Sequence, residues 1–394
     1  MLMPSLDTSI ANVALPTLAQ EFSASFHQIQ WVVAAYLVAV TLLIVTLGHL
    51  GDRVGRRRLL LAGIGVFTGA SLLCGAATAL WMLIGARIAQ GLGAAVMLAL
   101  GVAMVGDTVG HTSVGKAMGL LGTVSAIGTT LGPVLGGVLI GAFGWRSVFL
   151  VNLPIGVVNA LIVYRFLPDG RGDTRAAVGA DLLALGTLRS PALRASLAMS
   201  VLVSAVVMTT LVLGPFYLSR ALGLNAALVG LVMSAGPLVA ALTGVPGGRL
   251  VDRLGARRVA IGGLVAMSAG SVALSLIRVS DGIAGYVGPI AVLTAGYALF
   301  QAANNTAVMT SAGSHRRGAV AGLLALSRNL GLIAGSTAMG AVFAAATGDI
   351  ADARPDAVAT GLHLTFALAA VLTIAALALA LQRMTNATQV NDHN

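Results

Sequence analysis

Asp7 and Arg87 are the two residues whose types and positions suggest chemistry most clearly. Of the 13 Asp and Glu residues, Asp7 is the only one predicted to lie within an apolar span and away from its ends. Low-dielectric surroundings disfavour a carboxylate as an anion, so it can take up a proton, and an adjacent cation or water path lets it release that proton again. The alternative is that the short segment before Asp7 leaves it in water, with a structural role only.

Arginines inside apolar spans need a partner. Arg87 is costly to bury unless it pairs with an anion or faces a water-filled cavity, and Asp7 is its best candidate partner. Protonation of Asp7 would release Arg87, so the pair could work as an electrostatic switch. The alternative is an arginine fixed to helix-end carbonyls for packing. Arg328 is the second arginine that we expect to be buried. It has no acidic partner within its own span, and contact with substrate or with carbonyls remains open for it.

The composition indicates what must position these residues. Of 394 residues, 57% are hydrophobic and only 9% are charged, which is too little charge to solvate the surface of a soluble protein. Apolar runs long enough to cross a membrane recur along the chain. We predict an all-α polytopic membrane protein with twelve spans, at about 1–18, 29–50, 59–78, 82–107, 117–143, 148–166, 195–218, 226–251, 259–277, 285–312, 319–346 and 361–381.

The net charge of +10 raises the question of a nucleic-acid partner, and the distribution of the 23 Lys and Arg residues answers it. If both termini lie inside, Arg146, Arg220, Arg278 and Arg354 fall outside, Arg87 and Arg328 fall within spans, and all the others fall on the inner side. This matches the positive-inside rule. We therefore predict a multi-pass protein of the bacterial inner membrane with cytoplasmic termini and no nucleic-acid partner.

Two loops 200 positions apart indicate an internal duplication. Gly48, Asp52, Arg53, Gly55 and Arg57 recur as Gly248, Asp252, Arg253, Gly255 and Arg257. Many secondary transporters consist of two such six-helix halves with the substrate site between them. We predict an N-terminal bundle at 1–166, a cytoplasmic linker at 167–194, a C-terminal bundle at 195–383 and a cytoplasmic tail at 384–394.

These loops could also act as a conformational latch. Gly55 permits a tight turn, Asp52 can meet a helix amino terminus, and the arginines can reach Asp107 at the inner end of the fourth span. The alternative is that the basic residues after Gly55 only bind anionic lipid headgroups, which leaves Asp52 unexplained. The predicted latch residues are Gly48, Asp52, Arg53, Gly55, Arg57, Asp107, Asp252 and Arg253.

The sequence resembles a known family in several motifs. G-x-L-x-D-R-x-G-R-R at 48–57 is similar to motif A of the major facilitator superfamily, and R-I-A-Q-G at 87–91 to its motif B. L-D-T-S-I-A-N-V-A-L-P at 6–16 resembles the first-helix motif of EmrB/QacA-type drug:proton antiporters. The resemblance implies a major facilitator fold and supports a switch role for Arg87. Long members of that subfamily have fourteen spans, but the linker is too short and too polar for two more, so the chain resembles a twelve-span relative.

Residues 128–137 resemble motif C, which is associated with antiporters. Gly128, Gly132 and Gly136 recur every four residues and allow a neighbouring helix to approach, Pro133 bends the span, and Gly137 completes the motif. A bend found only in the first half would suit a seal against leak. Ordinary packing glycines are the alternative.

Only six residues precede Asp7, so the first helix is either short or begins further upstream.

We expect a secondary transporter that exports small, partly apolar compounds in exchange for protons. Candidate substrate-cavity residues are polar or aromatic positions within spans: Asn12, Trp31, Tyr36, Asn152, Phe216, Tyr217, Tyr297, Gln301, Asn304, Asn305 and Arg328. Because Asp7 is the only acid expected to be buried, a dication would lack a second counter-charge. Proton-coupled uptake is the alternative within transporters, and Pro133 argues against it.

The expected partners are a small-molecule substrate, protons and membrane lipids, with the protein acting as a monomer. Cys74 lies alone in an apolar span and the six histidines are scattered, so we expect no metal site. A membrane sensor or a membrane-embedded enzyme is the rival from another class. It would need a soluble domain or a nucleophile constellation, and neither is visible, so we expect no enzyme activity and no cofactor.

Overall fold

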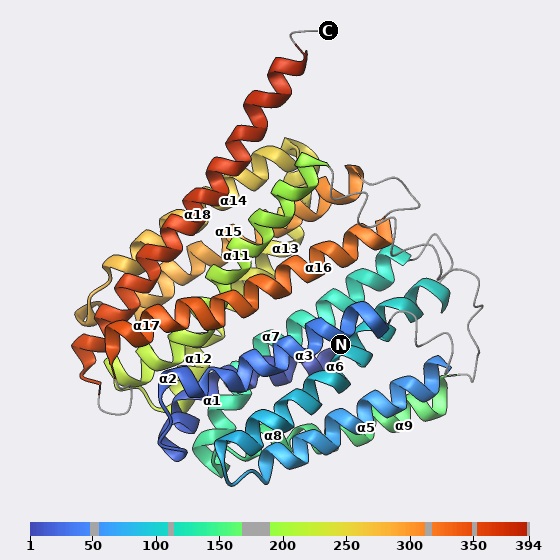
Figure 1. Ribbon diagram of the computed structural model, residues 1–394, viewed down its shortest axis with the longest axis vertical. Helices are drawn as coiled ribbons and strands as arrows, with labels where there is room; N and C mark the ends of the chain where they lie inside the picture. The colour runs from blue at the N-terminus through green and yellow to red at the C-terminus, as the bar shows by residue number, and fades with distance from the viewer. Residues whose placement is uncertain (48–54, 109–113, 168–189, 312–316, 349–352, 392–394) are drawn as a thin grey trace. The chain divides into compact units, whose positions relative to one another are not determined.

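The computed structural model describes residues 1–47, 55–108, 114–167, 190–311, 317–348 and 353–391, and every regular element in these ranges is helical (Figure 1). Eleven of the helical stretches among them are long and apolar enough to cross a membrane. Large apolar side chains such as Val157, Leu161 and Val265 are exposed on their surfaces. Such exposure suits a lipid environment, in which apolar surface costs nothing. The predicted all-α polytopic fold class is confirmed.

The described helices form two compact units. In the first, α1 packs against α7, α3 and α5 both pack against α6, and α5 also packs against α9. This unit contains α1 (Leu2–Glu21), α2 (Phe26–Ile29), α3 (Trp31–Leu47), α5 (Arg56–Gly75), α6 (Leu80–Thr108), α7 (Val114–Phe143), α8 (Ser147–Leu150), α9 (Asn152–Phe166) and α12 (Ala226–Met233).

Helix α1 differs from the eleven apolar stretches. It has 20 residues, which at 1.5 Å per residue is about the thickness of a hydrocarbon core. Its polar residues, Asp7 and Asn12 among them, keep it out of the apolar set, yet both side chains are buried. Neighbouring helices therefore shield polar groups that lipid would not tolerate. The described residues contain eleven apolar stretches, and α1 would be the twelfth span. The number of twelve spans therefore stays a prediction.

In the second unit, α14 packs against α15 and α18, α13 packs against α15, and α11 packs against α16. Its described α-helices are α11 (Pro191–Phe216), α13 (Ala235–Leu254), α14 (Ala256–Leu276), α15 (Gly282–Ser311), α16 (Arg317–Ala334), α17 (Gly340–Thr347) and α18 (Pro355–Asn391). A π-helical turn at Tyr217–Ala221 extends α11, another at Gly335–Met339 joins α16 to α17, and a 3₁₀ turn at Val279–Asp281 precedes α15.

The duplicated turns have matching backbone geometry. Gly55 and Gly255 precede α5 and α14, with φ angles of +95° and +84°. Residues that carry a side chain rarely adopt such φ angles, so both turns require glycine. Residues 168–189 of the predicted linker and 392–394 of the predicted tail lie outside the described residues. The four predicted segments and the three boundaries between them therefore stay a prediction.

The predicted span at 226–251 lies in one apolar stretch, Ala226–Leu254, that is divided into two helices. Its first part, α12, packs against α7 within the first unit, and a break at Ser234 separates it from α13. Pro237 lies within the first turn of α13 and has no N–H to donate to the carbonyl of Met233, so a helical hydrogen bond across the break cannot form. Hydropathy alone did not reveal this division.

Candidate functional site

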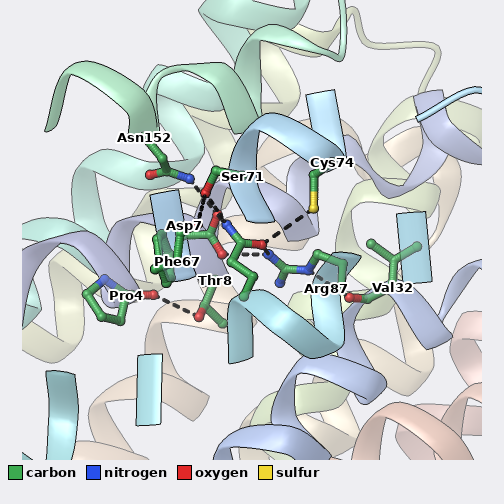
Figure 2. A network of polar contacts seen from close by, with 10 residues as sticks. Pro4, Asp7, Thr8, Val32, Phe67, Ser71, Cys74, Arg87 and Asn152 are labelled. Atoms are coloured by element: carbon green, nitrogen blue, oxygen red, sulfur yellow. Dashed lines mark hydrogen bonds and ion pairs between the residues drawn. The ribbon is translucent and has the colours of Figure 1, made fainter. Parts of the chain in front are cut away.

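Asp7 on α1 and Arg87 on α6 lie together in the interior of the first unit (Figure 2). An Arg87 Nη1 donates to Asp7 Oδ2 at 2.5 Å, and the two side chains are 0% and 1% exposed. The Nε of Arg87 donates to the backbone carbonyl of Val32 on α3 at 2.9 Å. The structure thus brings the two residues singled out above into one buried ion pair, although 80 positions separate them in the chain.

Gln90 links the ion pair to α5. It lies one turn after Arg87 and accepts from Arg87 Nη1 through Oε1 at 2.7 Å. Its Nε2 donates to Asp7 Oδ1 and to Ser71 Oγ, both at 2.8 Å. The thiol of Cys74 lies 3.7 Å from Gln90 Oε1. Gln90 and Ser71 are both fully buried, so these hydrogen bonds form away from water.

Asn152, the first residue of α9, provides the third donor to Asp7. Its Nδ2 donates to Asp7 Oδ1 at 2.7 Å, and its side chain is fully buried. The short helix α8 buries Val148 and Phe149 directly before it and so fixes the start of α9 beside α1. Asn152 was predicted as a substrate-cavity residue, whereas the structure places it against the carboxylate.

Two aromatic rings cover the guanidinium of Arg87. Its central carbon lies 4.4 Å from the centroid of the Tyr36 ring and 5.8 Å from that of Phe149. Cation–π attraction is strongest where the cation is desolvated. Tyr36, also predicted to line the substrate cavity, therefore belongs to the surroundings of the ion pair as well. Nη2 of Arg87 is buried without a hydrogen-bond partner among the described residues.

The geometry couples protonation of Asp7 to packing. Oδ1 accepts from Gln90 and Asn152, and Oδ2 accepts from Arg87, so all three neighbours donate. An ionised carboxylate only accepts, but a protonated one must also donate. Uptake of a proton removes the negative charge that strengthens these three hydrogen bonds, so the donors are held less tightly and can move away. Because the donors come from α6 and α9, such a movement alters contacts between three helices.

The remaining cavity candidates are dispersed. Asn12 is buried on α1 with neither amide atom hydrogen-bonded among the described residues, and Trp31 is 41% exposed. In the second unit, Tyr217 stacks on Tyr286 with ring centroids 5.7 Å apart, and Phe216 lies near Phe343. Gln301 donates to the hydroxyl of Tyr297 at 3.3 Å. Asn304 donates to the Ser196 carbonyl at 3.4 Å, and Asn305 is exposed.

Arg328 departs from the expectation of a second buried arginine. It is exposed on α16, one heptad after the exposed Ala321 and therefore on the same helix face. An exposed side chain of a membrane helix faces either lipid or a water-filled path, and a cation is tolerated only in the second. Contact of Arg328 with substrate therefore stays a prediction. The expectation of burial was wrong because hydropathy places a residue within a span but does not define the face on which it lies.

The predicted latch lies partly outside the described residues, which do not include Gly48, Asp52, Arg53 or the side chain of Asp107. Arg57 donates through Nη2 to the Tyr164 carbonyl of α9 at 2.6 Å, and its guanidinium lies 4.9 Å from the Tyr164 ring centroid. Asp252 and Arg253 are exposed at the end of α13. The latch remains a prediction.

The motif C glycines contact two helices. A Cβ on Gly132 would lie 2.5 Å from the Cβ of Ser9, and one on Gly128 would lie 2.9 Å from the Leu2 carbonyl oxygen. These positions and Gly136 face α1. Gly137 instead faces Ala226 on α12, and the Pro133 carbonyl faces Gly230. Small residues let helix backbones approach closely, and here they do so for α7 against both neighbours.

The substitution Gly132→Ala is expected to lower the free energy of unfolding by about 1–3 kcal/mol, the usual cost of overpacking. Gly141→Ala on the same helix is the matched control, since a Cβ there meets nothing within 4 Å. Its effect should be stabilising by up to about 1 kcal/mol, the helix-propensity gain. Thermal unfolding of the purified variants measures both. Equal effects at the two positions would show that α1 and α7 do not need this close approach.

Sequence reasoning assigned no role to Gln90, Ser71 or Cys74. The available signal for Gln90 was its spacing: three residues after Arg87, it shares the same face of α6. Ser71 and Cys74 lie one turn apart on α5, but nothing in an apolar helix distinguishes the face that meets α6. A contact between helices was needed to identify them.

Apolar helices that enclose a buried acid–base pair define an integral membrane protein of the transporter class, because ionisable groups inside membrane helices mark ion and substrate paths. Residues 1–336 match the Major Facilitator Superfamily, and the chain belongs to that family. It is therefore a transporter and not an enzyme.

Relatives with similar sequences are transporters too. The chain is 30% identical over 390 residues to the riboflavin transporter RibZ of Clostridioides difficile, covering 87% of this chain and 86% of RibZ. It is 28% identical over 407 residues to the multidrug resistance protein Stp of Mycobacterium tuberculosis, covering 88% and 74%. A bacterial homologue of the human lysosomal transporter Spinster has the same fold, with a TM-score of 0.81, 19% identity, and coverage of 96% and 93%.

Proposed function

We propose that this protein is a secondary active transporter that exports small, partly apolar compounds in exchange for protons. The observation that carries the proposal is the Asp7 carboxylate, buried and held by three donors from two other helices. Protonation removes the charge that strengthens these hydrogen bonds to α6 and α9, so protonation and conformation are linked. Alternating access would use this link: proton uptake accompanies substrate release on the outer side, and proton release accompanies substrate binding on the inner side.

Further features support export. The multidrug resistance protein Stp is a relative over most of its length, and the first-helix and motif C resemblances both point to drug:proton antiporters. The close packing of α7 against α1 and α12 suits a seal against leak. We further propose that the protein is an EmrB/QacA-like member of the family with twelve spans, and that it acts as a monomer. Its termini would be cytoplasmic, in a bacterial inner membrane, and the residues around Gly55 and Arg57 would form a conformational latch.

The substrates that we propose are neutral, zwitterionic, anionic or monocationic. The Asp7–Arg87 pair is neutral as a whole, so a dication would find no second buried counter-charge among the described residues. The name of RibZ indicates that a relative carries riboflavin, a compound with a large apolar ring system. Riboflavin and the monocationic dye ethidium are therefore suitable first substrates.

Proton release from proteoliposomes tests the function. The purified protein is reconstituted, riboflavin or ethidium is added outside, and the external pH is followed with a dye. Antiport predicts an exchange of protons for substrate that protein-free vesicles do not show. Substrate entry with no proton movement in any direction would contradict the proposal.

Proton-coupled uptake is the second candidate, and RibZ favours keeping it, because the name of that relative does not indicate a direction. Cells that produce the protein separate the two candidates. Lower accumulation of substrate than in cells lacking the protein indicates export, and higher accumulation of every compound tested indicates uptake.

The substitution Asn152→Ala is expected to impair proton coupling without weakening substrate binding. It removes one donor from Asp7 and touches no other described polar group. The number of protons exchanged per substrate should fall, while the Kd for substrate changes by less than about twofold. Asn159→Ala is the control on the same helix, since its hydrogen bond among the described residues runs from Nδ2 to Met3 Sδ at 3.6 Å, away from Asp7. A large change in Kd with normal coupling would instead make Asn152 a substrate contact.

A further inference from the structure

A cavity of about 470 Å³ lies inside the second unit, near one end of its helices. It is bounded by the start of α11, the start of α14, the last turns of α15, and α18. This volume is that of a small-molecule pocket rather than of a site for a few waters. The lining residues are Ala192, Met199, Ala256, Arg257, Ala260, Ala303, Asn304, Ala307, Thr310 and Ala380.

The walls of the cavity are apolar and its side chains are small. Six of its ten lining residues are alanines, and Met199 and Ala303 are buried. Packed clusters flank it, with Leu193 and Val308 in one and Val251 and Val259 in the other. The space is therefore a defined gap between well-packed regions, and its interior suits a hydrocarbon chain.

Polar groups occur at defined points of the wall. Asn304 is 3% exposed, and its Nδ2 donates to the Ser196 carbonyl at 3.4 Å. Arg257 is exposed and forms no ion pair among the described residues. The arginine provides a cation where the cavity reaches the helix ends.

The start of α14 adds to this positive character. Gly255 precedes the helix and caps it with no side chain, which leaves its first N–H groups uncapped next to Arg257. Helix amino termini and arginines both favour anions, and arginine binds phosphate with two parallel hydrogen bonds. A ligand for this cavity must thus combine one anionic group with an apolar chain.

We propose that this cavity binds an anionic phospholipid, with one acyl chain among the alanines and the phosphate on Arg257. In a membrane-spanning bundle, the molecules that combine these two features and are always present are the lipids of the adjoining leaflet. In the topology proposed above, this is the inner leaflet. The lipid would fill the gap between the two packed clusters and tie α14 to α11 and α15.

Native mass spectrometry of the full-length detergent-purified protein tests this site by titration with phosphatidylglycerol and phosphatidylcholine. Phosphatidylglycerol should bind more tightly, and Arg257→Gln should weaken it about tenfold, the effect of losing one charge-assisted hydrogen bond. Arg258→Gln is the matched control, because it removes the same charge from the next residue, which does not line the cavity. Its effect should stay below about twofold.

Cavity filling tests the acyl chain separately. Ala260→Leu and Ala307→Phe keep Arg257 and should each reduce phosphatidylglycerol binding, while glycerol 3-phosphate should not displace the lipid. Equal effects of Arg257→Gln and Arg258→Gln would overturn the proposal. So would displacement by glycerol 3-phosphate, which would indicate a site for a soluble phosphate, or unchanged binding in both filled variants while these remain monodisperse.

Discussion

Asp7→Asn is expected to abolish proton movement driven by substrate in proteoliposomes. Asparagine has nearly the same shape but cannot take up or release a proton, so a transporter that uses Asp7 for coupling must lose it completely. Substrate binding and passive exchange of substrate across the membrane should survive, since the substitution nearly preserves the shape of the side chain. The external pH and the flux of labelled substrate, measured on the same vesicles, report the two quantities separately.

Glu21→Gln provides the matched control for this variant. Glu21 is at the other end of α1, is 44% exposed and lies 3.5 Å from Arg146, so its loss removes one acid from the same helix without touching the site. It should behave like the unmodified protein. If Asp7→Asn also couples normally, Asp7 is structural and the proton site lies elsewhere.

The largest effect on stability is expected when the buried ion pair is split. Asp7→Asn leaves the cation of Arg87 buried without its counter-charge, and Arg87→Gln leaves the anion of Asp7 in the same position. Removing one member of a buried pair costs about 3–5 kcal/mol of the free energy of unfolding. The variant with both substitutions buries no net charge, and it should lose less stability than either single variant.

Unfolding of the four proteins in one detergent gives the interaction energy by a double-mutant cycle. The exposed pair of Glu21 and Arg146 gives a second cycle for comparison, and its interaction energy should stay below about 1 kcal/mol. If the double variant has lost as much stability as the sum of the single variants, the two side chains do not interact and the buried pair has no role in packing. Restored stability without restored coupling would separate the structural role of the pair from its function.

Much of the fold follows from the sequence. The apolar runs predicted an all-helical membrane protein, and the structure confirms that class. The spacing of the two glycine turns predicted a duplication, and both turns have a positive φ. The scarcity of charge within the spans drew attention to Asp7 and Arg87, which meet in the structure. Each signal is local, because charge and hydropathy act on the nearest stretch of chain.

The surroundings of the ion pair did not follow from the sequence. Asn152 lies 145 positions from Asp7, and it was assigned to the substrate cavity because an isolated asparagine in a span carries no information on its partner. Gln90 and Ser71 received no role, although both belong to the hydrogen-bonded network. Arg328 was expected to be buried, yet it is exposed.

The sequence by itself indicated that the protein lies in a membrane, that its architecture is duplicated, and that Asp7 and Arg87 are ionisable residues within membrane spans. Such residues are costly to bury and usually have a functional role. Only the tertiary structure decided which donors surround Asp7, which helices the glycines of α7 approach, and that α12 packs with the first unit. The physical reason is that the lipid and the interior of the helix bundle are equally apolar, so the hydrophobic effect does not choose which face of a helix is buried. Hydropathy therefore fixes where a helix crosses the membrane but leaves its rotation and its neighbours to packing and hydrogen bonding.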